Sequence, residues 1–265
     1  MNSSTHIVRL VCRAVAIITL VVLSSCASTG HRPGDVSQET ARKMYVEGMH
    51  DLVDGSYEEA LVRFRKLAQN FPLYMTYTKL AKLRLADTLF QDDRHLEAVE
   101  VYQEFASLYP QDPNVSYARY MAARALAARI PSDVAFFSPA IRLDMSRVLQ
   151  ARDALKAFLK SNPESTYSLE AALLLRDIRA RLYAHHKYVA SFYSERSIPK
   201  GTLNRLAEMY RGYPEWAASR GNLNRVLELA EETELSAQVS DIQDAFKKRF
   251  PKPMDSSDPA EESLQ

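Results

Sequence analysis

One pattern of small, apolar and proline positions recurs along most of the chain. A small residue is followed by apolar residues four and seven positions later, and by a proline twelve positions later. The copies begin at Ala60, Ala98, Ala151 and Thr202, with a weaker copy at Val239. Offsets of four and seven share one helical face, and proline ends a helix, so each copy predicts the second helix of a helical hairpin.

The prolines that end these copies are separated by 38, 53, 51 and 37 residues, a spacing typical of helical-hairpin arrays. Gly48, Ala60, Phe64 and Pro72 resemble the small, Ala, aromatic and Pro positions of the tetratricopeptide repeat. Glu47 departs from that repeat, which has an apolar residue there. We predict an all-α fold, an α-solenoid of about five tetratricopeptide-like hairpins. An insertion at 130–148 and a long helix at about 168–194 account for the two larger spacings.

The N-terminus predicts a secretion signal rather than a folded element. Arg9 and Arg13 precede a short apolar run, and Leu23-Ser24-Ser25-Cys26 resembles a bacterial lipobox. That resemblance implies a lipid on Cys26, although an ordinary signal in which Cys26 is incidental is the alternative. The residue after Cys26 is not Asp, which favours the periplasmic face of the outer membrane. The predicted organisation is a signal peptide at 1–25, a lipidated Cys and flexible tether at 26–40, the repeat domain at 41–251 and a disordered acidic tail at 252–265.

Composition narrows the classes of function. Only seven of 265 residues are glycine, which disfavours phosphate-binding loops and most all-β folds. Both cysteines lie in the first 26 residues, and the formal net charge is +1, so neither a thiol site nor nucleic-acid binding is expected. No catalytic motif is present. We therefore predict no enzymatic activity, no metal and no cofactor besides the lipid. His185 and His186 point about 100° apart on a helix, so a surface role is favoured over a shared metal ion.

The first helices of stacked hairpins line a concave face that binds other proteins. Repeat numbering from Ala41 places candidate groove residues at positions 5, 9 and 12 of the first two repeats. They are Tyr45, Met49, Leu52, Leu83, Asp87 and Phe90. Such a Met and aromatic lining can accept segments with varied side chains, but the same residues could instead be core between repeats.

Three local segments carry a more specific pattern: residues 112–121, residues 188–196 and Asn204-Arg205. They resemble, in that order, the motifs His-Pro-Asn-x-x-Tyr-x-x-Tyr-Met, Val-Ala-x-Tyr-Tyr-x-x-Arg and Asn-Arg of the BamD family, lipoproteins of the β-barrel assembly machinery. The family usually has Glu where His186 stands, and a different loop at 197–200. The resemblance covers roughly residues 40–235.

The resemblance implies a scaffold that assists insertion of β-barrel proteins into the outer membrane. It implies that Arg205 docks BamA, the barrel-forming partner, and that the N-terminal repeats receive unfolded outer-membrane proteins; other lipoproteins of the machinery are further expected partners. Asn204, Arg196 and Tyr193 are added as neighbours of Arg205. Alternatively, Arg205 covers apolar surface with its stem. The alternative function is a tetratricopeptide lipoprotein adaptor for peptidoglycan or cell-division machinery.

Overall fold

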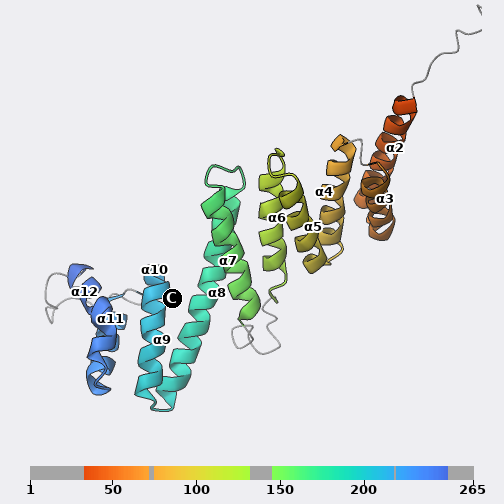
Figure 1. Cartoon of the computed structure of the whole chain (residues 1–265). Helices are drawn as coiled ribbons and strands as arrows, with labels where there is room; N and C mark the ends of the chain where they lie inside the picture. Colours follow the sequence, from red (N-terminus) through yellow and green to blue (C-terminus); the bar gives the residue numbers. More distant parts are fainter. Residues whose placement is uncertain (1–32, 72–74, 132–144, 218, 250–265) are drawn as a thin grey trace, which may run out of the picture. The chain divides into compact units, whose positions relative to one another are not determined.

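The computed structural model describes residues 33–71, 75–131, 145–217 and 219–249. This part of the chain is built from helices and contains no strand, which confirms the predicted all-α class. The chain divides into two compact units, residues 1–84 and 85–265, and the division falls inside helix α4 (Met75–Gln91). Figure 1 labels the described helices, from α2 near the N-terminus of the chain to α12 near its C-terminus.

The first unit is a helical hairpin followed by the start of α4. Helix α2 (Pro33–Val53) packs against α3 (Tyr57–Asn70), and Gly55, with a φ of 78°, turns the chain between them. A Cβ atom on Gly48 would lie 2.8 Å from Cε1 of Phe64, whose side chain is fully buried. The glycine therefore allows α2 and α3 to cross closely, as its repeat position predicted.

The second unit is a longer series of packed helices. Helices α5 to α9 pack in sequence, each on the next, and α9 also packs against α11, which contacts α12. The elements are α5 (His95–Leu108), α6 (Val115–Ala128), α7 (Ser146–Ser161), α8 (Ser168–Glu195), α9 (Pro199–Gly212), α10 (Pro214–Ala217), α11 (Arg220–Glu232), η2 (Ser236–Val239) and α12 (Ser240–Arg249).

The repeated positions form the core of the hairpins. In the first two copies of the pattern, Ala60, Phe64, Ala98 and Tyr102 have no exposed surface. The third copy is buried in the same way, at Ala151, Leu155 and Phe158, each at most 3% exposed. In the fourth copy Thr202 is 5% exposed, and its hydroxyl donates to the Ile198 carbonyl at 3.1 Å. The apolar period therefore identified the buried face correctly.

The predicted start of the repeat domain is wrong, and several other predicted segments lie outside the described residues. Helix α2 begins at Pro33, eight residues before the predicted start at Ala41, so residues 33–40 are helical rather than part of a tether. Proline suits the first turn of a helix because its missing N–H has no partner there. The signal peptide, Cys26, most of the 130–148 insertion and the 252–265 tail lie outside the described residues. Helix α8 spans 28 residues, matching the long helix expected there.

Candidate functional site

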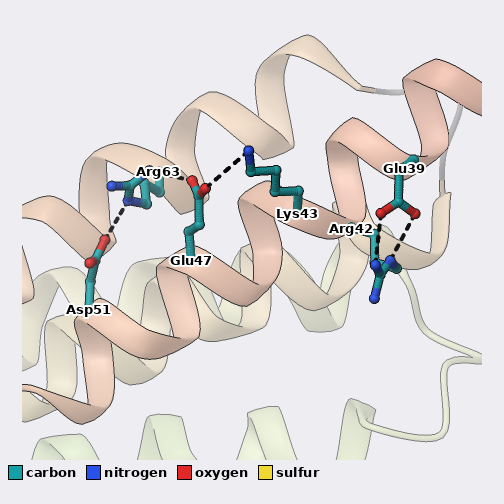
Figure 2. A network of polar contacts seen from close by, with 6 residues as sticks. All are labelled: Glu39, Arg42, Lys43, Glu47, Asp51 and Arg63. Atoms are coloured by element: carbon teal, nitrogen blue, oxygen red, sulfur yellow. Dashed lines mark hydrogen bonds and ion pairs between the residues drawn. The ribbon is translucent and has the colours of Figure 1, made fainter.

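Charged side chains join α2 and α3 at Glu47, the position where the tetratricopeptide repeat has an apolar residue. Arg63 on α3 donates from Nε to Asp51 and from Nη1 to Glu47 at 2.7 Å, both on α2 (Figure 2). Lys43 lies 3.9 Å from Glu47. Asp51 is the most buried of the three paired groups, with 17% of its side chain exposed. Glu47 is thus accommodated by a cation on the neighbouring helix, which explains its departure from the repeat pattern.

The predicted groove residues of the first unit are half-buried. Tyr45 packs against Phe64 and Tyr77, with ring centroids 6.0 and 6.1 Å apart, and its hydroxyl accepts a hydrogen bond from Arg84 Nε at 3.4 Å. Met49 and Leu52 are also partly exposed on α2. These three side chains retain surface that a partner can contact.

Two other predicted groove residues need correction because they are buried. Leu83 is 1% exposed and Asp87 is 8% exposed. The Asp87 carboxylate accepts hydrogen bonds from Tyr102 at 2.6 Å and from Tyr117 at 2.9 Å. Asp87 therefore joins α4 to α5 and α6 and does not offer its carboxylate to a groove. Burial, followed by the Asp87 charge and hydrogen bond, raises the pKa of Tyr102 far above its ordinary value, so this hydroxyl remains a donor.

Phe90, the last predicted groove residue, is half-buried in the second unit. Its ring lies 5.2 Å from that of His95, and the Arg124 guanidinium lies 5.4 Å from its centroid. Phe90 therefore combines packing with partial exposure.

Arg205, the predicted docking residue, belongs to a polar cluster on α8 and α9. Its Nη1 donates to Glu208 Oε2 at 2.7 Å, one turn along α9, and 33% of its side chain is exposed. The same Glu208 oxygen lies 3.4 Å from Nδ1 of His186 on α8. A guanidinium has five N–H donors, so the contact with Glu208 leaves others for a partner carboxylate.

The neighbours proposed for Arg205 lie around the turn between α8 and α9. Arg196 stacks its guanidinium 3.6 Å from the centroid of Phe192, which is 40% exposed, and donates to the Phe192 carbonyl. Tyr193 lies against Gly201, where a Cβ atom would come within 2.9 Å of the ring. Asn204 is exposed beside Arg205. The structure thus records separate contacts for Arg196 and for Arg205.

The paired histidines differ in environment. Burial lowers the pKa of His186, and Arg205 and His185 lower it further against the opposing effect of Glu208. The two imidazole centroids are 6.0 Å apart and their planes are inclined by 72°. Within the described residues, no group of three or more His, Cys, Asp and Glu side chains is placed to hold a metal ion.

A hollow that the sequence interpretation missed is lined by residues of α8, α9, α10 and α11. Its volume is about 830 Å³, and Tyr183, Met209 and Trp216 are among the residues that line it. Trp216 is the single tryptophan of the chain, and it is the one feature of the sequence that could have pointed to this hollow. None of the described helices is both long and apolar enough to cross a membrane.

The fold described above defines a helical-hairpin repeat protein. A sequence model of the YfiO family, described as outer membrane lipoproteins, matches residues 37–244, which is 208 of 265 positions. The chain belongs to this family.

Relatives named outer membrane protein assembly factor BamD match along nearly the whole chain. The Haemophilus influenzae protein is 26% identical over 233 residues, covering 87% of this chain and 88% of that protein. The Pasteurella multocida protein is 25% identical over 243 residues, with coverage of 89% and 92%. The Neisseria gonorrhoeae protein is 26% identical over 241 residues, covering 88% of each. These matches agree with the family that the local motifs indicated.

Proposed function

We propose that the chain is a scaffold subunit for the assembly of β-barrel proteins in the outer membrane, and that it acts without covalent chemistry. The observation that carries this proposal is the collinear match to proteins named as outer membrane protein assembly factors, over nearly nine-tenths of both chains. A repeat array suits such a task because stacked hairpins provide extended surfaces for several partners at once.

The lipobox-like segment supports attachment to the outer membrane through a lipid on Cys26. Each buried CH₂ of an acyl chain contributes about 0.8 kcal/mol to membrane binding, so more than one chain gives a stable anchor. The repeat domain then faces the periplasm. Replacing Cys26 by Ala should move the protein to the soluble periplasmic fraction, and a variant that stays bound to membranes lacking BamA would contradict lipid anchoring.

One end of the chain docks BamA through Arg205 in this proposal. The half-exposed guanidinium has donors left over from Glu208, and a partner carboxylate can take them as a bidentate pair. The pair with Glu208 is a solvent-exposed i,i+3 contact, worth at most about 1 kcal/mol, so it does not prevent a partner from binding. Asn204, Arg196 and Tyr193 extend the same surface around the turn.

The N-terminal repeats receive unfolded substrate in this proposal. Tyr45, Met49 and Leu52 on α2 are the predicted groove residues of the first unit that keep exposed surface, and Phe90 does so in the second unit. The flexible Met side chain suits binding of varied sequences. Leu83 and Asp87 are excluded because they are buried.

Co-purification from membranes tests the docking proposal. Full-length wild type and Arg205→Glu are extracted in detergent and probed for a BamA-type protein. We expect the charge reversal to lose the partner because it places a carboxylate against a carboxylate. Arg176→Glu is the matched control, since Arg176 is an exposed arginine on α8 that pairs only weakly with Asp177 at 3.4 Å.

The outcomes separate the scaffold from the site. Loss in Arg205→Glu with retention in Arg176→Glu supports both the function and the docking residue. If wild type and both variants co-purify equally with the BamA-type protein, the proposed function is supported and Arg205 is not the docking residue. Absence of any barrel-assembly protein with wild type would overturn the proposed function.

A further inference from the structure

The hollow lined by α8, α9, α10 and α11 has both buried and exposed lining residues. Ala190 and Met209 are 5% and 4% exposed and lie at its base, while Lys187 on α8 and Arg225 on α11 are exposed at its edge. A volume of about 830 Å³ is within the range of about 300–1,000 Å³ that is usual for binding pockets. The hollow is therefore large enough to bind a segment of another molecule.

Aromatic groups form one side of the hollow. The Tyr183 and Trp216 ring centroids are 5.8 Å apart with planes inclined by 39°, and the Tyr183 hydroxyl donates to the Trp216 carbonyl at 3.4 Å. Trp216 is half-exposed, so part of its indole faces the hollow. Such rigid aromatic surfaces bind large apolar side chains with little loss of conformational entropy.

The rim carries more positive than negative charge. Lys187 forms no ion pair with the part of the chain that the structure describes, and Arg225 pairs with Glu228 at 3.3 Å in an exposed contact on its own helix. Glu195 is the only acidic side chain among the described lining residues. One cation thus stands on each of two helices that line the hollow, and each can contact a carboxylate of a bound segment.

Length and chemistry together indicate the occupant. On α8 the lining runs from Tyr183 to Glu195, twelve residues apart, which at about 1.5 Å per residue spans about 18 Å and matches about five or six extended residues. The Ser191 hydroxyl donates to the Lys187 carbonyl at 3.0 Å and can still accept from a backbone N–H, and the exposed Ser194 can bind the backbone of such a segment as well. We propose that this hollow binds an extended acidic peptide segment that carries an aromatic side chain, in addition to the docking surface at Arg205.

Defined peptides and the single tryptophan allow a direct test. Full-length protein in detergent is titrated with arrayed eight-residue peptides of four compositions: acidic with Phe, acidic with Ala in place of Phe, basic with Phe, and uncharged with Phe. Trp216 fluorescence reports occupancy. We expect saturable binding by the acidic peptides with Phe. The basic and uncharged peptides should bind more weakly, by up to about fivefold for each exposed charge pair that they lack. The acidic peptides with Ala should bind more weakly because they lack the aromatic contact.

Charge reversal on the rim distinguishes recognition from a structural effect. Lys187→Glu and Arg225→Glu should each weaken binding of the acidic peptides about fivefold, and the double variant should prefer the basic peptides with Phe. Arg176→Glu, with the same charge change outside the hollow, should bind like wild type, and circular dichroism checks that all variants are folded. The proposal would be overturned if the double variant still preferred the acidic peptides to the basic ones. It would also be overturned if no acidic peptide with Phe bound saturably to the wild-type protein. Loss of BamA co-purification in these variants is not required, so either proposal can fail alone.

Discussion

Replacing Asp87 by Ala should destabilise the second unit, because this carboxylate is a buried acceptor and not a groove residue. Two tyrosine hydroxyls, at 2.6 and 2.9 Å, donate to it. Tyr102 has no exposed surface, so its hydroxyl cannot turn to water when the acceptor is removed. The variant therefore breaks two hydrogen bonds and leaves the buried Tyr102 hydroxyl with the neighbouring Tyr117 hydroxyl in place of a carboxylate.

The size of the effect follows from those contacts. A hydrogen bond to a charged group contributes about 1.5–3 kcal/mol, so the two bonds together contribute about 3–6 kcal/mol. Removing the buried charge offsets part of this, since a buried carboxylate carries a desolvation cost. We expect a net loss of about 2–4 kcal/mol in the free energy of unfolding. For a domain of this size that lowers the melting temperature by about 4–16 °C.

Thermal unfolding followed by far-ultraviolet circular dichroism measures the change. Asp177→Ala is the matched control, because Asp177 is 68% exposed on α8 and should change the melting temperature by no more than about 2 °C. A triple variant, Asp87→Leu with Tyr102→Phe and Tyr117→Phe, removes donors and acceptor together and should recover much of the loss. An Asp87→Ala protein with the same melting temperature as wild type would refute the reasoning, and Asp87 would again be a candidate groove residue.

Three further predictions concern packing and titration. Gly48→Ala should lower the denaturant midpoint, because the new Cβ atom would lie 2.8 Å from the buried Phe64 ring. Such overpacking costs about 1–3 kcal/mol, which exceeds the gain of about 1 kcal/mol in helix propensity. A raised midpoint would show that the ring can move. Burial raises the pKa of Tyr102, and it raises the pKa of Tyr120 to about 12. Above pH 10 the unfolded chain therefore holds fewer protons than the folded chain, and the free energy of unfolding should fall with rising pH. Equal urea midpoints at pH 9 and 11 would contradict this prediction. Burial lowers the pKa of His186 from 6.5, so the unfolded chain binds the proton first and stability should fall as pH drops below about 6.5; His186→Gln should reduce that slope, and an identical slope in the variant would rule His186 out.

The architecture could be predicted from sequence because its determinants are local. Ala60, Phe64 and Leu67 lie within seven residues, and their helical spacing alone places them on one face. The same reasoning located the other hairpins and the long helix α8. It missed the helical start at Pro33 because the polar composition of residues 33–40 has no apolar period.

The surfaces were harder to predict because their determinants are distant in sequence. Asp87 meets donors 15 and 30 residues away, so repeat numbering could not distinguish a groove acid from a buried acceptor. The cation that accommodates Glu47 stands 16 residues later on another helix. The hollow beside Trp216 exists only after α8, α9 and α11 have packed, so no single segment could reveal it.

Helix α8 gives the array a mechanical property that short hairpins lack. Its 28 residues extend about 42 Å at 1.5 Å per residue, and it packs against both α7 and α9. It is twice as long as α9, and Arg179 near its middle ties it to the Gly212 carbonyl and to Glu215. A tilt of about 5° about one end moves the other end of such a rod by about 4 Å. A small change in the packing of α8 on α7 would therefore displace the turn beside Arg196 by several ångströms while α8 itself stayed helical.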